Sequence, residues 1–276
     1  MLELLFCTFV APLLAGAHVL PGTCSLSASL TFCTSQRITY IYDINATFVH
    51  LINTLPCKLD WVGQYNGTLY FHPKCKDFIK SVDGTEIKLP SKKVCKVVLR
   101  GHTLLAVGSN WFLAYDLKSK VKLVEGRGFS CPATLSPNGQ FAVLRDLKRN
   151  VMVVIDLRHG GLVTFTIPFK CWRDADWGKG GLALTRPGST WFNSRIYPYG
   201  GQKVVVGDKP YMIDTSPYCE GVLTIVKGRD YCIDLGFVPS SISVINDTVA
   251  VSKGGIIIFI DVEGSLMQAL RPSTPT

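Results

Sequence analysis

The chain has 276 residues, of which 47% are hydrophobic and 18% are charged. This balance excludes an intrinsically disordered protein and is typical of one large folded unit. The formal net charge of +9 at pH 7 points to anionic partners. The ten cysteines are dispersed and never form a Cys-x-x-Cys pair, which argues against a zinc site.

Residues 1–17 have the pattern of a secretory signal. An apolar run from Leu4 to Leu14 precedes Ala15-Gly16-Ala17, a group of small residues that fits cleavage after Ala17, although Glu3 stands where a Lys or Arg is usual. The alternative is a buried first strand of the folded domain. We expect a signal peptide over 1–17, a folded domain over 18–271 and a polar tail over 272–276. The protein would then be secreted or reside in the endoplasmic reticulum lumen. No other segment approaches the ~20 apolar residues of a membrane span, so we expect no transmembrane segment.

Short apolar strands, separated by turns, recur along the chain in groups of three. Their middle strand often ends in Asp, and each group is too small to bury its own apolar face. Such groups form a radial or solenoid array in which neighbours share a core, so we predict an all-β protein, a six- or seven-bladed β-propeller. The clearest groups are 30–33, 37–43 and 48–55; 104–107, 111–116 and 121–124; 141–144, 151–156 and 162–167; and 248–251, 256–261 and 266–270.

The expected blades start at Pro, Gly or Cys residues or next to them, roughly 30 to 40 residues apart, slightly closer than the ~40 to 45 of a four-stranded WD-type blade. In the unit that starts at Lys209 two strands are evident, at 222–227 and 231–235, which leaves the number of blades open by one. Within the strands, we expect Val153 and Ile155 to alternate with Val154 and Asp156, and Ile256, Ile258 and Ile260 to be buried. The units begin near Gly22, Cys57, Ser91, Phe129, Phe169, Lys209 and Pro239.

One unit carries a family resemblance. Residues 135–143, Leu-Ser-Pro-Asn-Gly-Gln-Phe-Ala-Val, precede an apolar strand from Val151 to Asp156. This order resembles one blade of the WD-repeat and related propeller families, and the resemblance implies architecture without any activity. In addition, Gly188-Ser189-Thr190-Trp191 resembles the second half of the Asp-box hairpin of sialidase propellers, where Leu184 and Arg186 stand at the Ser and Asp positions of the box.

Cysteines and sequons agree with an oxidising compartment. An odd number of cysteines remains after removal of residues 1–17, so up to four disulfides would leave one thiol, able to link a partner chain as a dimer. The alternative is that most are buried thiols. Asn45, Asn66 and Asn246 each head an Asn-x-Thr sequon at an expected turn, and we predict that they carry glycans. The nine cysteines are Cys24, Cys33, Cys57, Cys75, Cys95, Cys131, Cys171, Cys219 and Cys232.

The positive charge is concentrated in the middle of the chain. Between Lys92 and Arg158 there are twelve Lys and Arg against four acids. If 118–122 is extended, its three lysines share one face of a strand. For a secreted protein we expect a sulfated glycan or a cell-surface protein as the partner, rather than nucleic acid; the alternative is a solvated surface. The candidate polyanion-binding residues are Lys92, Lys93, Lys96, Lys118, Lys120, Lys122, Arg145, Lys148 and Arg149.

Motifs for catalysis are missing from the sequence. The five His residues have no metal-ligand spacing, and neither Gly-x-Ser-x-Gly nor a Walker loop occurs. We therefore predict no catalytic residue, metal or cofactor, and favour a secreted, glycosylated binding module. Two alternatives stay open. One is a glycan hydrolase that uses Asp174 and Asp176, an acid pair between Trp172 and Trp177, although two acids of an ordinary turn would look the same. The other is a structural surface component of a virus or parasite.

Overall fold

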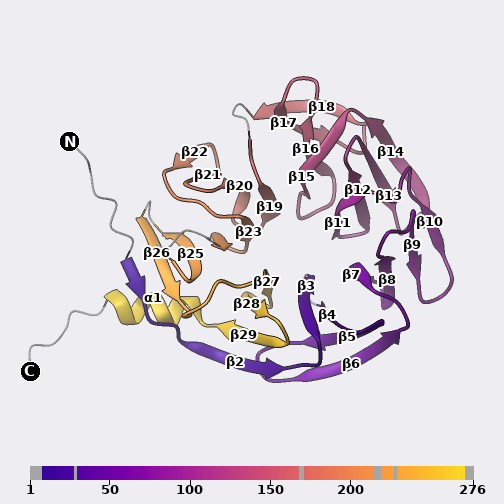
Figure 1. Cartoon of the computed structure of the whole chain (residues 1–276). Helices are drawn as coiled ribbons and strands as arrows, with labels where there is room; N and C mark the ends of the chain where they lie inside the picture. Colours follow the sequence, from indigo (N-terminus) through magenta and orange to yellow (C-terminus); the bar gives the residue numbers. More distant parts are fainter. Residues whose placement is uncertain (1–7, 28–29, 168–170, 214–218, 227–228, 271–276) are drawn as a thin grey trace, which may run out of the picture.

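The computed structural model describes residues 8–27, 30–167, 171–213, 219–226 and 229–270. Their strands form seven sheets around a central axis, and the chain is a seven-bladed β-propeller (Figure 1). The predicted all-β propeller is therefore confirmed, with the larger of the two expected blade numbers. The predicted tail over 272–276 lies outside the described residues.

Each blade is an antiparallel sheet whose first strand lies innermost. Blades 1 to 3 consist of β3 (Thr23–Ser27), β4 (Leu30–Ser35), β5 (Ile38–Ile44) and β6 (Val49–Leu55); β7 (Leu59–Tyr65), β8 (Thr68–Pro73), β9 (Phe78–Ser81) and β10 (Glu86–Lys88); and β11 (Val94–Arg100), β12 (Thr103–Gly108), β13 (Trp111–Asp116) and β14 (Val121–Arg127).

Blades 4 to 6 follow in the same order. They consist of β15 (Phe129–Leu135), β16 (Phe141–Asp146), β17 (Val151–Asp156) and β18 (Leu162–Ile167); β19 (Asp174–Gly178), β20 (Gly181–Arg186), β21 (Ser189–Phe192) and β22 (Arg195–Tyr197); and β23 (Lys203–Val206), β24 (Pro210–Ile213), β25 (Gly221–Val226) and β26 (Arg229–Asp234). The short strand β1 (Thr8–Val10) adds to β26 in parallel.

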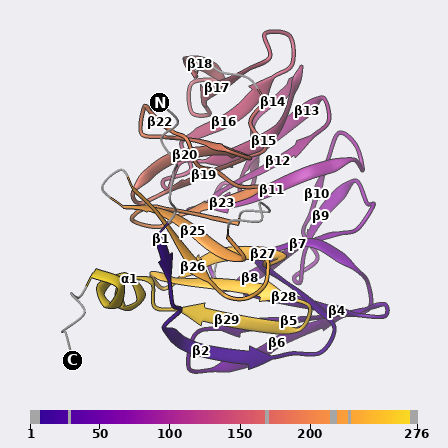
Figure 2. The same cartoon turned by 60° about the vertical axis from the view of Figure 1, so that its left-hand side comes forward.

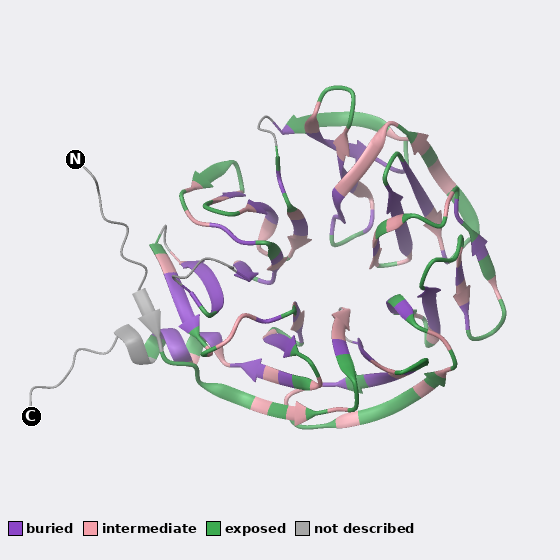
Figure 3. Ribbon diagram, in the orientation of Figure 1, coloured by how far each residue is buried: buried purple, intermediate pink, exposed green. Residues whose placement is uncertain are grey.

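Blade 7 is built from both ends of the chain. It contains β27 (Ser241–Ile245), β28 (Thr248–Lys253) and β29 (Ile256–Ile260), and its outer strand is β2 (Leu14–Val19), which pairs antiparallel to β29. This pairing closes the ring. The alternative expectation, an N-terminal strand, therefore agrees with the structure for 14–19, but this strand lies at the rim and is largely exposed rather than buried (Figure 3).

Two predicted elements were wrong. Residues 266–270 are not a strand but belong to α1 (Val262–Leu270), which lies beside β1 at the outside of the ring in both views (Figure 1 and Figure 2). Asp261 caps this helix by accepting the N–H of Gly264 at 2.9 Å, and Val262 and Leu266, four residues apart, are both buried. Blade 6 does not start at Lys209, which lies in the turn between β23 and β24, so β24 is the strand that the sequence analysis missed.

The remaining predicted blade starts fall at the first strand of a blade or a few residues before it, and Phe169 lies outside the described residues. The predicted strands correspond largely to the outer three strands of each blade. The innermost strands lack a continuous apolar run, because polar and small residues interrupt them, as in Phe129–Leu135, and the sequence pattern does not distinguish them from loops.

The core lies between neighbouring blades. In blade 4, Val153 and Ile155 are buried against blade 3, while Val154 packs in the cluster towards blade 5, as expected for a sheet covered on both faces. In β29 the prediction failed in part: Ile260 is buried, but Ile258 is only partly buried, and Ile256, at the end of the strand, is 48% exposed. Besides Ile260, the fully buried side chains of β29 are Ile257 and Phe259.

The ring has two ends, which differ in the turns they carry. At the crossover end, the second strand of a blade turns into the third, and the chain passes to the next blade. At the opposite end, the first strand turns into the second and the third into the fourth. Because antiparallel strands alternate in direction, these two sets of turns must lie apart. Hydrogen bonds join turns at the crossover end: Leu147 donates its N–H to the Gly128 carbonyl at 2.9 Å.

Candidate functional site

The centre of the ring holds a cavity of about 820 Å³. It is lined by the innermost strands, β3, β7, β11, β19, β23 and β27 among them. Charged side chains from both ends of these strands reach its wall: Asp60, Lys96, Arg100, Arg173, Asp174, Asp176, Lys179, Lys203 and Asp247.

Asp174 and Asp176 form ion pairs within this wall. Lys96 Nζ lies 2.6 Å from Asp174 Oδ1, and Arg100 Nη2 lies 3.2 Å from Asp176 Oδ1. The second oxygen of each carboxylate accepts a backbone N–H of β23, from Val204 at 3.1 Å and Val206 at 2.8 Å. Each Asp thus joins β11 to β23 through β19.

These contacts give the two carboxylates a structural role. A cation neutralises each one and backbone donors occupy the other oxygen, so neither is placed as the proton donor or nucleophile that glycoside hydrolysis requires. The pair also lies on a strand rather than in a turn. Lys96, one of the candidate polyanion-binding residues, forms this ion pair and lies in the wall of the central cavity.

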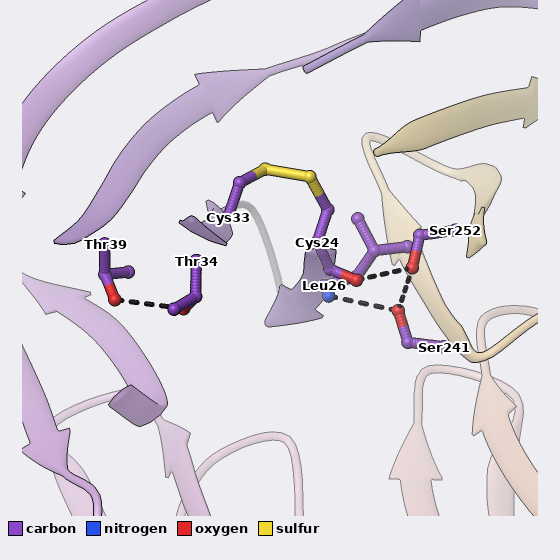
Figure 4. Close-up of a disulfide and its surroundings, with 7 residues drawn as sticks. All are labelled: Cys24, Leu26, Cys33, Thr34, Thr39, Ser241 and Ser252. Atoms are coloured by element: carbon purple, nitrogen blue, oxygen red, sulfur yellow. Dashed lines mark hydrogen bonds between the residues drawn. A yellow bond between two sulfur atoms is a disulfide. The ribbon is translucent and has the colours of Figure 1, made fainter. Parts of the chain in front are cut away.

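Three disulfides stabilise the ring. Cys24–Cys33 joins register partners on β3 and β4, with a Cα–Cα distance of 4.0 Å (Figure 4). Cys95–Cys131 joins the innermost strands of blades 3 and 4, and Cys219–Cys232 lies within blade 6. The expected disulfides are confirmed. Among the described cysteines, Cys57, Cys75 and Cys171 are free thiols, one half-buried and two exposed.

Hydroxyl groups tie blade 7 to blade 1 next to the first disulfide. Ser241 Oγ accepts the N–H of Leu26 at 3.2 Å, and Ser252 Oγ donates to the Cys24 carbonyl at 3.0 Å (Figure 4). The two hydroxyls also bond each other at 2.6 Å. The blade completed by β2 is therefore joined to the first blade by specific polar contacts as well as by apolar packing.

The three sequons lie at the opposite end of the ring, in turns of the adjacent blades 7, 1 and 2. Asn66 and Asn246 are exposed and have φ of 48° and 49°, as two-residue hairpin turns require. Asn45 is half-buried, and its Oδ1 accepts the N–H groups of Thr47 and Phe48 at 2.8 and 3.0 Å. Glycosylation of the three residues stays a prediction.

The candidate basic residues do not gather in one patch. Lys118 and Lys120 lie in the turn after β13 at the opposite end, whereas Lys148 and Arg149 lie in the turn after β16 at the crossover end, with Lys92 and Lys93. The segment 118–122 is not extended throughout, which was the condition for its lysines to share a strand face: the Asp116 carboxylate accepts the N–H of Lys118 at 2.7 Å and closes a turn over 117–120. Lys122 is on β14 and pairs with Glu125, and Arg145 is held by Asn150.

The structure instead groups nine exposed cations at the crossover end of blades 1 to 4. We call this group the basic arc. Five of its members are not among the candidates predicted from the sequence. Once four strands per blade are known, the alternation of turns between the two ends would assign these residues to the crossover end. The basic arc comprises Arg37, Lys58, Lys74, Lys76, Lys92, Lys93, Arg127, Lys148 and Arg149.

No protein-family model matches the chain, and no curated protein matches it. Two solved structures of propellers are similar. A chain of the mitotic checkpoint complex has a TM-score of 0.67 at 12% identity, over 92% of this chain and 93% of that one. BamB from Moraxella catarrhalis has a TM-score of 0.59 at 9% identity, over 91% and 99%. At such identities the likeness shows the fold alone, which confirms the propeller resemblance seen in the sequence.

Two further properties concern the described residues. None of their helices has the length and apolar character that crossing a membrane requires. In that part of the chain, moreover, no three His, Cys, Asp or Glu side chains come together as metal ligands would.

Proposed function

We propose that this protein is a binding module of an oxidising compartment, secreted or resident in the endoplasmic reticulum lumen and glycosylated on Asn45, Asn66 and Asn246. Three disulfides support this proposal, because such bonds persist where thiols are not kept reduced. The fold supports a binding role, since a rigid ring of strands presents many loops at each end.

The observation that carries the proposal is the position of the three sequons. All lie at one end, in neighbouring blades. Glycans there would cover the opposite end around the channel mouth, because Asn66 and Asn246 occupy turns of innermost strands. The crossover end is then the surface left for a partner, which we propose to be a cell-surface protein or a sulfated glycan.

The proposed signal peptide and the ring closure use the same residues. Cleavage after Ala17 would leave His18 and Val19 of β2, so a processed protein would have a three-stranded blade 7. A retained segment would keep the closure that the structure describes. N-terminal sequencing of the exported protein distinguishes the two, because the processed chain begins at His18.

Expression in a eukaryotic secretory host tests the proposal. We expect exported protein whose mobility increases after removal of N-glycans, and whose mobility without that treatment rises stepwise in Asn45→Gln, Asn66→Gln and Asn246→Gln variants. The exported protein is then screened against arrays of glycans and cell-surface proteins. An unglycosylated chain found in the cytosol with reduced cysteines would overturn the proposal.

A further inference from the structure

We propose that the basic arc is a binding site for sulfated glycan chains. The proposal rests on the function proposed above and names the chemistry of its partner. The arc follows the ring over four consecutive blades and alternates between the turns inside blades and the crossovers between them. Exposed cations placed in this way form a curved row rather than a compact patch. A row can contact successive anionic groups along an extended polyanion.

The charges of the arc are largely available. Of its nine members, Arg149 pairs with Asp146, at 3.8 Å, and no other has a carboxylate within ion-pair distance among the described residues. Two exposed acids, Asp60 and Asp77, lie in the same turns or next to them. The excess of positive charge therefore attracts anions without first breaking internal pairs, and the attraction falls with salt because the charges are solvated.

The chemistry of these turns favours sulfated sugars over single-stranded nucleic acid. Proteins that bind single strands place aromatic side chains under the bases. The turns 36–37, 56–58, 74–77, 89–93, 109–110 and 147–150 contain no aromatic residue. Lysine and arginine heads on short turns instead offer charge to sulfate groups along a chain.

A pair of matched variants tests this inference with heparin as the probe. Lys74→Ser/Lys76→Ser/Lys92→Ser removes three charges from the arc, and Lys118→Ser/Lys120→Ser/Lys122→Ser removes three charges outside it, so the two variants have the same net charge. We expect the first to lose roughly 10-fold or more in heparin affinity at 0.1 M salt and the second to lose about 2-fold or less, because exposed charges act over ~10 Å.

Equal losses in the two variants would mean that net charge alone governs retention, and would overturn the inference. So would failure of the wild-type protein to bind heparin at low salt, or tighter binding of single-stranded DNA than of heparin. Both variants keep the three sequons, so export and glycosylation report separately on the proposed function. If the protein is exported and glycosylated but does not bind heparin, the proposed function of the basic arc is refuted, whereas the proposal of a binding module is not.

The register of β7 and β8 supports a second, independent inference. We propose that Cys57 and Cys75 form a fourth disulfide in the oxidised protein. Leu59 on β7 pairs with Pro73 on β8, and beyond this pair Lys74 donates its N–H to the Lys58 carbonyl at 2.9 Å. One residue further from the strands, Cys57 precedes β7 and Cys75 lies in the turn after β8, so continuation of the same register would place them opposite each other.

The position favours a bond. In a regular antiparallel ladder hydrogen-bonded and non-hydrogen-bonded pairs alternate, so the pair beyond Lys58 and Lys74 would be a non-hydrogen-bonded one, with Cα atoms about 4.5 Å apart. The disulfide Cys24–Cys33 already joins register partners in the neighbouring blade. Cys75 has φ of 64°, in the turn that follows β8, so the turn must adjust to bring its sulfur onto Cys57.

The bond forms by exchange with a small disulfide such as oxidised glutathione. Burial raises the pKa of the Cys57 thiol, whereas Cys75 is exposed. The Cys75 thiolate attacks the oxidant and releases one glutathione. Cys57 then attacks the Cys75 sulfur and releases the second, so two thiols lose two protons and two electrons to one oxidised glutathione. Cys171 stays as the single thiol among the described cysteines.

Peptide mapping of exported, non-reduced protein after alkylation tests this pairing. We expect a linked Cys57–Cys75 peptide and alkylation of Cys171; in Cys75→Ser, Cys57 becomes alkylated, whereas the control Cys171→Ser keeps the link. Alkylation of both Cys57 and Cys75 in wild-type protein, with the other three bridges intact, would overturn the inference. If Cys75→Ser is not exported, the wild-type map alone decides.

Discussion

Aspartates at strand ends explain the most regular feature of the sequence at the scale of single residues. Asp116, Asp146 and Asp156 each end a strand, and each carboxylate accepts the N–H groups two and three residues later, at 2.7 to 3.3 Å. A short acceptor side chain thus closes the turn and satisfies backbone donors that no strand can reach. The repeated Asp is a structural device.

Removal of one such carboxylate should destabilise the fold in a pH-dependent way. Burial alone would raise the pKa of Asp116, but the N–H groups of Ser119 and Lys118 and the nearby His102 hold this pKa below its usual value. A lowered pKa gives stability that is present above ~3.9 and is lost as pH falls through the lower folded value.

We therefore expect Asp116→Ala to reduce the free energy of unfolding by about 1 kcal/mol at pH 7, as the loss of a helix-capping acceptor does. The difference from wild type should shrink as pH falls below about 4. Urea unfolding of both proteins over pH 2.5 to 7 measures it, and a difference that is independent of pH would contradict this account.

Truncation of a buried aliphatic side chain tests the packing between blades. Ile155 is 1% exposed, so Ile155→Ala should cost about 2 to 5 kcal/mol of unfolding free energy. The matched control is Ile256→Ala on β29, which is half exposed and should cost about 1 kcal/mol or less. Equal costs in denaturant unfolding would show that the two faces of these blades are not covered as described.

At the scale of elements, β2 decides how the ring is completed. Its backbone pairs with β29, and the N–H of Leu13, just before it, bonds Ser265 Oγ of α1 at 2.8 Å. His18 Nε2 and the Asn45 carbonyl lie 2.8 Å apart, so β2 also contacts blade 1. The segment is specifically packed, although its side chains face solvent for much of their surface.

Gly16→Ala provides a test of β2, and it keeps a small residue at this position of the expected cleavage site. A Cβ at this position would collide with the backbone of Ala46. In protein that keeps its N-terminus, Gly16→Ala should therefore lower the unfolding free energy by about 1 to 3 kcal/mol, the usual cost of overpacking. Urea unfolding gives the value. An unchanged stability in protein whose N-terminus is verified as intact would contradict the close contact in β2.

At the scale of the whole molecule, the ring depends on its last blade. Blade 7 packs against blade 6 through Ile242, Val249 and Val251, and against blade 1 through Phe259. Removal of residues from Pro239 onward would expose the faces of both neighbours and leave β2 without its partner strand.

We expect the chain truncated after Val238 to aggregate or to fail to be exported. Size-exclusion chromatography of the secreted fraction and thermal unfolding measure the outcome. A soluble fragment with a cooperative transition would show that blades 1 to 6 are stable alone and that closure through blade 7 is dispensable.

The sequence by itself determined the architecture. Alternating apolar strands, turn residues such as Pro137-Asn138-Gly139 and a repeat too short to bury its own faces allow few solutions, because such units are stable only where neighbouring units share a core. These signals are local, so they can be recognised in each blade without aligning the blades with one another. The predicted start of blade 6 was wrong because β24 begins at Pro210, directly after a turn. The predicted strand at 266–270 was wrong because the apolar residues of the nine-residue helix α1 also fit the pattern of a short apolar strand.

Only the tertiary structure decided where the charges and cysteines lie. Lys118 and Lys148 are close in sequence and of like charge, yet antiparallel turns send them to opposite ends of the ring. The sequence places Asp174 and Asp176 together as a candidate acid pair, whereas the structure shows that Lys96 and Arg100, from another blade, neutralise them. The partner strand of β29 comes from more than 230 residues away along the chain. Such long-range contacts leave no pattern in the local sequence. Each contact depends on which blades the closed ring brings together and not on the residues adjacent in the chain.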